Sequence, residues 1–102
     1  MEKRNLDSVA VTNNEAKRQF EAEVDGAVAV AQYTLAGDRI IFTHTEVPPE
    51  MEGQGVAGKL VRTALDHARA EGLAIQPLCP FVRSYIQRHP EYQDLVSQHS
   101  HR

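Results

Sequence analysis

Three glycines within six positions form the most distinctive cluster in this sequence. Gly53, Gly55 and Gly58 lie between a segment rich in β-branched residues and a segment with helical periodicity. The first backbone amides of a helix have no partners within the helix, and the helix dipole places positive charge at that end. Because glycine has no side chain, an anion can approach these amides closely, so the sequence predicts a phosphate-binding loop. The alternative is a tight turn in which glycine only relieves backbone strain.

Two kinds of phosphate loop compete for these glycines. Residues 53–60 nearly match the nucleotide-binding pattern G-x-x-x-x-G-K-[ST], with Lys59 at the lysine position. Leu60, however, stands where that pattern requires a magnesium-binding hydroxyl, and it falls on the apolar face of the following helix. No apolar strand ending in a magnesium-binding aspartate follows. The sequence therefore disfavours a nucleotide-hydrolysing P-loop protein.

The segment 47–57, VPPEMEGQGVA, resembles the part of GCN5-related N-acetyltransferases in which [Q/R]-x-x-G-x-[G/A] follows a strand. In that family the loop binds the pyrophosphate of acetyl-CoA. Gly55 and Ala57 match the motif, whereas Glu52 places a carboxylate where the family has glutamine or arginine. Because backbone amides make most of the contacts, we expect binding to survive this substitution. The resemblance implies an acetyl-CoA site formed by Val47, Glu52, Gly53, Gln54, Gly55, Val56, Ala57, Gly58 and Lys59.

The resemblance covers about residues 20–92, and two further motifs make the chain resemble a subfamily of small acetyltransferase-like proteins. These motifs are Cys79-Pro80-Phe81 and the segment 89–92, His-Pro-Glu-Tyr, which replaces the Gly-Phe typical of the family. Larger relatives have two helices between their first two strands that shape the acceptor site, whereas here Asp25-Gly26 joins two strands directly. We therefore expect a reduced or open acceptor pocket, which a homodimer or a large acceptor would complete.

Acetyl transfer to an amine needs a base for the ammonium, a polarised thioester carbonyl and a proton for the departing thiolate. His44 and Glu46 are candidate bases, because the two-residue period of a strand puts them on the face of Ile40 and Phe42. This holds only if no β-bulge reverses the alternation. The alternatives are a solvated strand end for Glu46 and a hydrogen-bonded core residue for His44.

Tyr85 and Cys79 are the remaining catalytic candidates. The family usually carries a tyrosine on the corresponding helix, near the departing sulfur of CoA, so Tyr85 is the candidate acid; the alternative is an amphipathic ring packed on the sheet. Cys79 ends the strand expected next to the loop-bearing strand, so its thiol is a candidate nucleophile that His44 would activate. The alternative is a buried structural cysteine.

The elements that position these residues follow from hydrophobic periodicity. Apolar and acidic residues alternate over 19–25, and strands at 27–35 and 39–47 follow after glycine-containing turns. Pro48 ends the third strand. Residues 1–15 are polar and predict a loose start, with at most a short strand at 9–11.

An amphipathic helix follows the glycine loop, since apolar residues recur on one helical face from Val56 to Ala68. Gly72 stops it, residues 73–79 form a short buried strand, and a second helix spans about 81–88. Strand, helix and strand form a βαβ unit with parallel strands. The predicted fold class is α/β (α+β), a minimal GNAT-like mixed sheet in which an antiparallel meander precedes a βαβ unit and a C-terminal helix.

Length and composition fit a single domain, residues 1–102 with a core at about 18–95. No apolar run could cross a bilayer, and no signal-like segment precedes the strands, so we expect a cytoplasmic protein that does not bind membranes. A formal charge of −3 argues against nucleic acid. We expect no metal site, and a flexible N-terminus and tail, although His99 and His101 alternate in that tail.

The leading hypothesis is an acetyl-CoA-binding N-acetyltransferase that acts on an unidentified amine. The alternative is a non-catalytic module that binds acetyl-CoA or CoA.

Overall fold

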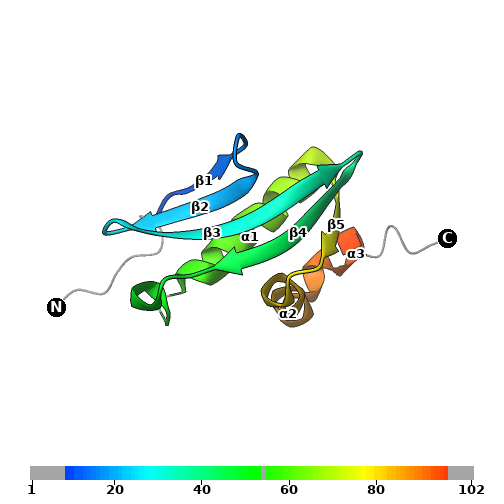
Figure 1. The fold of residues 1–102 in the computed structure, drawn as a ribbon. Coiled ribbons are helices and arrows are strands. Elements are labelled where there is room, and N and C mark those ends of the chain that lie inside the picture. Colours follow the sequence, from blue (N-terminus) through cyan, green and yellow to red (C-terminus); the bar gives the residue numbers. More distant parts are fainter. Residues whose placement is uncertain (1–8, 54, 97–102) are drawn as a thin grey trace.

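The computed structural model describes residues 9–53 and 55–96, which form one mixed sheet covered by helices (Figure 1). The strands lie side by side in chain order, the first four antiparallel and the fifth parallel to the fourth. They are β1 (Val11–Asn14), β2 (Gln19–Val24), β3 (Ala27–Ala36), β4 (Arg39–Glu46) and β5 (Ala74–Pro77). The predicted meander, βαβ unit and mixed sheet are confirmed.

Three α-helices and two 3₁₀ helices complete the described fold. They are η2 (Pro49–Met51), α1 (Val56–Glu71), α2 (Pro80–Arg88), η3 (Pro90–Tyr92) and α3 (Gln93–Val96). Helix α1 ends as predicted, because Gly72 adopts a left-handed conformation with φ of 71° and its amide caps the last turn. Residues 90–96, for which the sequence suggested no helix, form η3 and α3.

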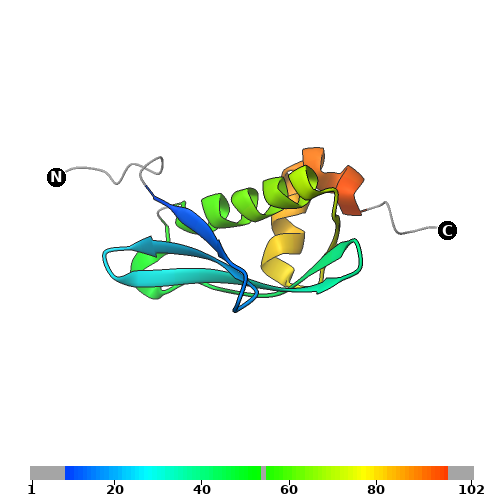
Figure 2. The same ribbon diagram turned by 90° about the horizontal axis from the view of Figure 1, so that it is seen from above.

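The helices lie on one face of the sheet, and the opposite face is not covered by any described element (Figure 2). The buried face of α1 consists of Val56, Leu60, Val61, Ala64, Leu65 and Ala68. It packs on inward-facing strand residues such as Phe20, Ala31 and Phe42. Because α1 connects β4 to β5, its N-terminus lies where β4 ends, and this position brings the glycine loop to the edge of the sheet.

The start of the described chain differs from the prediction. Asn13 and Asn14 belong to β1, which pairs with β2, although asparagine is a weak strand former. Their side chains have partners across the sheet: the Tyr33 hydroxyl donates to Asn13 Oδ1 at 2.6 Å, and Asn14 Nδ2 donates to Glu21 at 3.1 Å. Cross-strand hydrogen bonds of this kind offset the low propensity.

The predicted strand at 73–79 is shorter than expected. Its ladder ends at Pro77, because the amides of Leu78 and Cys79 both donate to the carbonyl of Phe42, at 3.0 and 2.9 Å. This turns the chain out of the sheet and into α2, whose first residue is Pro80. The tail with His99 and His101 lies outside the described residues, as does the segment 1–8. Among the described helices, none is long and apolar enough to cross a membrane.

Candidate functional site

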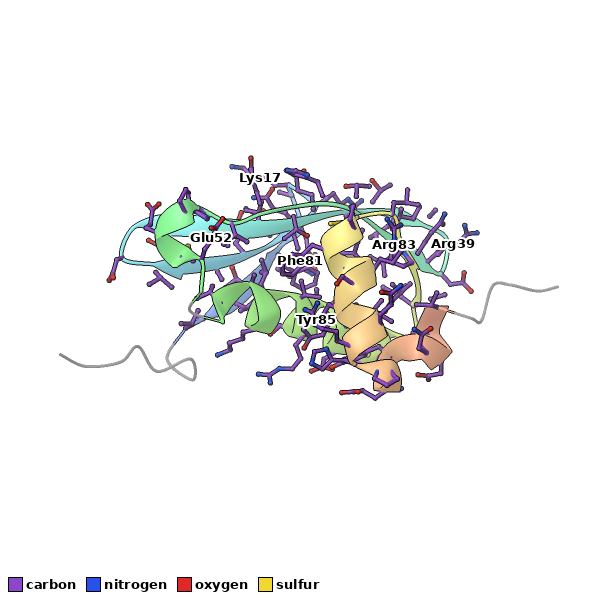
Figure 3. All side chains as sticks on the ribbon, turned by 90° about the horizontal axis from the view of Figure 1, so that it is seen from below. Lys17, Arg39, Glu52, Phe81, Arg83 and Tyr85 are labelled. Atoms are coloured by element: carbon purple, nitrogen blue, oxygen red, sulfur yellow. The ribbon has the colours of Figure 1, made fainter. Side chains whose placement is uncertain are left out.

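A cleft of about 380 Å³ opens between the end of β4, the glycine loop and the start of α2. Its walls are formed by Thr45, Val47, Met51, Glu52, Gly53, Gly55, Ala57 and Phe81. Figure 3 shows Glu52 beside the glycine loop and Phe81 at the first turn of α2. Five of the residues predicted for the cofactor site therefore line one cleft; they are Val47, Glu52, Gly53, Gly55 and Ala57.

The glycine loop leaves the N-terminus of α1 accessible. Gly53 and Gly55 both have left-handed backbone angles, with φ of 82° and 80°, which residues with a side chain rarely adopt. Gly55 is the N-cap of α1, and among the described residues no side chain caps its first amides. The first turn of α1 contains no acidic residue. These amides are therefore available to an anion that enters the cleft.

Four other residues of the predicted cofactor site have different surroundings. Val56 is fully buried in the core and anchors α1. Gly58 is helical, and a Cβ added there would lie 3.9 Å from Tyr85 Cε2, so its position allows a side chain. The Lys59 ammonium donates to the carbonyl of Val9 at 2.7 Å, which ties the start of the described chain to α1. Gln54 lies outside the described residues.

A β-bulge at Thr43 reverses the alternation along β4. Tyr33 of β3 pairs with Phe42, but Gln32, the residue before Tyr33, pairs with His44. Thr43 therefore has no partner of its own and is the extra residue of the bulge. Before the bulge, Ile40 and Phe42 are buried on the helix-covered face. After it, His44 and Glu46 are exposed.

The cross-strand partners confirm this assignment of faces. Thr45 pairs with the buried Ala31, whereas Glu46 pairs with Val30 of the uncovered face. The prediction that His44 and Glu46 share a face with Ile40 and Phe42 is therefore wrong. The residue of this segment that faces the helices and the cleft is Thr45.

Cys79 lies at the N-cap of α2 and is 3% exposed. Its sulfur is 3.2 Å from Thr45 Oγ1, a hydrogen bond in which either atom is able to donate. The expectation that His44 reaches this thiol from the neighbouring strand is not met, because the bulge turns His44 to the other face. Cys79 is adjacent to β4, as predicted, but it is not among the residues that line the cleft.

Tyr85 is buried between α1 and α2, one helical turn after Phe81 (Figure 3), and like Cys79 it is not among the residues that line the cleft. Its ring stacks on His89, with centroids 4.0 Å apart and an angle of 17° between the planes. Burial raises the pKa of the Tyr85 phenol above its usual value, and the charge of Arg62 opposes this shift. The phenol therefore remains protonated at neutral pH, as a proton donor must.

The strand edge beside the cleft is left unpaired by β5, its neighbour among the described strands. β4 pairs with β5 only from Arg39 to Phe42, whereas its pairing with β3 continues to Glu46. After Phe42 the chain of β5 departs into α2, so the edge of β4 beyond the bulge is not paired with β5. An extended ligand that carries amides can add to such an edge.

Sequence reasoning missed three residues of the cleft, Thr45, Met51 and Phe81. Counting by two from Ile40 placed Thr45 on the wrong face. Phe81 was noted in the Cys-Pro-Phe motif but not assigned to the site, and Met51 lies in η2, which the proline-rich sequence did not suggest.

Comparisons with known proteins agree with this architecture. Residues 19–95 match the family described as GCN5-related N-acetyl-transferase. Protein NATD1 of Mus musculus is 33% identical over 85 residues, covering 80% of this chain and 77% of that protein. Protein NATD1 of Homo sapiens is also 33% identical over 85 residues, and the match covers 75% of its length. The NMR structure of a GCN5-like protein from Staphylococcus aureus has a TM-score of 0.68 and 29% identity, and the match covers 90% of this chain and 96% of that one.

Proposed function

Because this chain belongs to the GCN5-related N-acetyltransferase family, we propose that it binds acetyl-CoA in the cleft beside the glycine loop and transfers the acetyl group to an amine. The observation that carries the proposal is the open N-terminus of α1 at one end of that cleft. The backbone amides after Gly55 hold the pyrophosphate, because they lie at the positive end of the dipole of helix α1, which favours an anion.

The rest of the cofactor follows the cleft away from the loop. The pantetheine arm contains two amides, and it lies along the edge of β4 that β5 leaves unpaired. The thioester then reaches the end of the cleft formed by Thr45 and Phe81. This orientation places the reacting carbonyl beside the bulge of β4 and next to the first turn of α2.

The acetyl transfer uses groups from both faces of the sheet. The amine approaches from the uncovered face, where His44 or Glu46 accepts the ammonium proton. The amine nitrogen bonds to the carbonyl carbon, the carbon–sulfur bond breaks, and CoA leaves as a thiolate. Tyr85 donates the proton that converts the thiolate to the thiol. The nitrogen loses its second proton as the amide forms, and this proton returns through water to the Tyr85 phenolate.

The alternative function is binding of acetyl-CoA without turnover. One observation favours it: the first two strands, β1 and β2, are joined by a short turn at residues 15–18, so no helices enclose an acceptor site between them. The sequence predicted this direct connection at Asp25-Gly26, which joins β2 to β3, because it did not predict β1 at Val11–Asn14. A second copy of the chain or a large acceptor would have to complete the site. Acceptor-dependent release of CoA distinguishes the two functions.

The decisive binding experiment is a calorimetric titration of the full chain with acetyl-CoA, CoA and ATP with magnesium. We expect acetyl-CoA and CoA to bind and ATP not to compete with them. Release of CoA is then followed with a panel of amines that includes spermidine and lysine-containing peptides. Binding without release for any amine would favour the non-catalytic module, and no binding of acetyl-CoA would overturn the proposal.

Gly55→Val is expected to weaken acetyl-CoA binding by at least about tenfold, roughly 1.4 kcal/mol. The branched side chain enters the space of the pyrophosphate and opposes the left-handed conformation of the loop. Gly72→Val is the matched control, because Gly72 has a similar φ of 71° at the other end of α1 and a Cβ there meets nothing. The control should lose stability but keep its affinity. Equal affinities of both variants would refute the assignment of the loop.

Lys59→Ala is expected to reduce acetyl-CoA affinity by no more than about fivefold, because a charge contact at a surface is worth about 1 kcal/mol or less. Its ammonium bonds to the carbonyl of Val9, so the larger effect should be on unfolding in urea. Removing that hydrogen bond should lower the free energy of unfolding by about 1 kcal/mol. A large loss of affinity at unchanged stability would instead place Lys59 at the phosphates.

A further inference from the structure

The bulge of β4 brings together two residues that are far apart in the sequence, Thr45 and Cys79. Their side chains share a hydrogen bond of 3.2 Å between Oγ1 and Sγ. Cys79 is held from a second side, because its amide donates to the carbonyl of Phe42 at 2.9 Å. The thiol is therefore fixed against one hydroxyl at the junction of β4 and α2.

Only one member of this pair faces the cleft. Thr45 lines it, whereas Cys79 is 3% exposed and lies behind Thr45. A thioester that enters the cleft therefore comes next to Thr45, whereas Cys79 does not border this space. This arrangement argues against direct attack by Cys79 on the acetyl group.

The hydrogen bond between the two groups has two possible directions, because each group carries one proton. The direction in which the thiol donates gives the hydroxyl oxygen, the better acceptor of the two, the accepting role. If the Cys79 thiol donates to Thr45 Oγ1, the proton of the threonine hydroxyl remains available to a group in the cleft. The thioester carbonyl oxygen is the atom that gains negative charge when an amine attacks.

We propose that Thr45 is a catalytic residue whose hydroxyl donates to the thioester carbonyl oxygen, and that Cys79 is a positioning residue that orients this hydroxyl. The inference rests on the proposed acetyl-CoA site. In the transfer, the carbon–nitrogen bond forms and the carbonyl oxygen becomes an oxyanion, which Thr45 stabilises. The carbon–sulfur bond then breaks and the carbonyl re-forms. No atom of Thr45 or Cys79 is transferred.

The first test needs no acceptor. Full-length protein is loaded with acetyl-CoA that is isotopically labelled at the acetyl carbonyl carbon, and the carbonyl stretch is measured by infrared difference spectroscopy. A hydrogen bond from Thr45 lowers the frequency of this stretch relative to free acetyl-CoA. The shift should persist in Thr45→Ser and disappear in Thr45→Val, which has the same shape as threonine without the hydroxyl. A shift that is unchanged in Thr45→Val would overturn the proposal.

The second test uses turnover with any amine that supports release of CoA. Loss of one donor to the oxyanion should lower kcat of Thr45→Val by about 100-fold, with Thr45→Ser restoring most of it. Cys79→Ser should remain active, since a serine hydroxyl is also able to donate to Oγ1, whereas Cys79→Ala should be impaired. A residue with a merely structural role would not show rescue by the conservative variant.

The competing mechanism gives the opposite pattern. If Cys79 were the nucleophile, acetyl-CoA alone would produce an acetyl adduct, sensitive to hydroxylamine and visible by intact mass, and Cys79→Ser would lose both the adduct and turnover. That result would overturn the proposal. Failure of the natural protein to bind acetyl-CoA in the calorimeter would overturn the proposed function itself, and this inference with it. Binding of acetyl-CoA without a shift of the carbonyl stretch would refute the role of Thr45 and leave the proposed function standing.

Discussion

Leu60→Thr is expected to lower the free energy of unfolding by about 3 kcal/mol, within the range for large-to-small substitutions in a core. The substitution completes the pattern G-x-x-x-x-G-K-[ST] of a nucleotide-binding loop. Leu60 is fully buried on the face of α1 that packs against the sheet, however. The threonine hydroxyl would therefore lie in the core, away from any magnesium ion, and would leave a cavity. We expect no gain of ATP binding.

The measurements are unfolding in urea and titration with ATP and magnesium. Leu60→Met is the matched control, since it conserves volume and should cost less than about 1.5 kcal/mol. A stable Leu60→Thr variant that binds ATP with magnesium would show that the glycine loop is a nucleotide site. That outcome would remove the physical basis for an acetyl-CoA loop here.

Tyr85→Phe is expected to reduce kcat by about 100-fold while leaving acetyl-CoA affinity nearly unchanged, since general acid catalysis by one side chain contributes a factor of this order. Phenylalanine keeps the ring that stacks on His89 and packs near Gly58, so the fold should be preserved. The pKa of the Tyr85 phenol is raised by burial. The activity should therefore fall through deprotonation of the Tyr85 phenol only above about pH 10, which is the ordinary pKa of tyrosine.

Tyr92→Phe is the matched control for this experiment. Tyr92 is also buried, and its hydroxyl donates to Asp66 Oδ1 at 2.6 Å, which links η3 to α1. Removing this hydrogen bond to a charged group should lower the free energy of unfolding by about 1.5–3 kcal/mol without a change in kcat. If kcat is unchanged in Tyr85→Phe, the acid is another group. If both variants lose activity in proportion to stability, Tyr85 has only a structural role.

Local patterns in the sequence were enough to predict the main elements. The strands at β2 to β4, the helix α1 and its end at Gly72 each depend on periodicity or turn chemistry within a few residues. The glycine loop is local in the same sense, because the conformations of Gly53 and Gly55 follow from the absence of a side chain. The order of the sheet follows from short turns and one helical connection, which leave few alternatives.

Contacts between distant segments decided the rest. β1 forms although its asparagines disfavour a strand, because β2 and Tyr33 supply partners that local sequence does not contain. β5 ends early because one carbonyl, that of Phe42, accepts from two successive amides. Neither the formation of β1 nor the early end of β5 can be predicted from the residues of the strand itself.

The same limit applies to the candidate site. The two-residue period of a strand assigns faces only while pairing is regular, and whether an extra residue is accommodated depends on the partner strand. The sequence therefore determined that β4 carries His44, Thr45 and Glu46 beside the glycine loop. Which of them faces the cleft was decided by the pairing of Gln32 with His44, and the thiol 34 residues away then met Thr45.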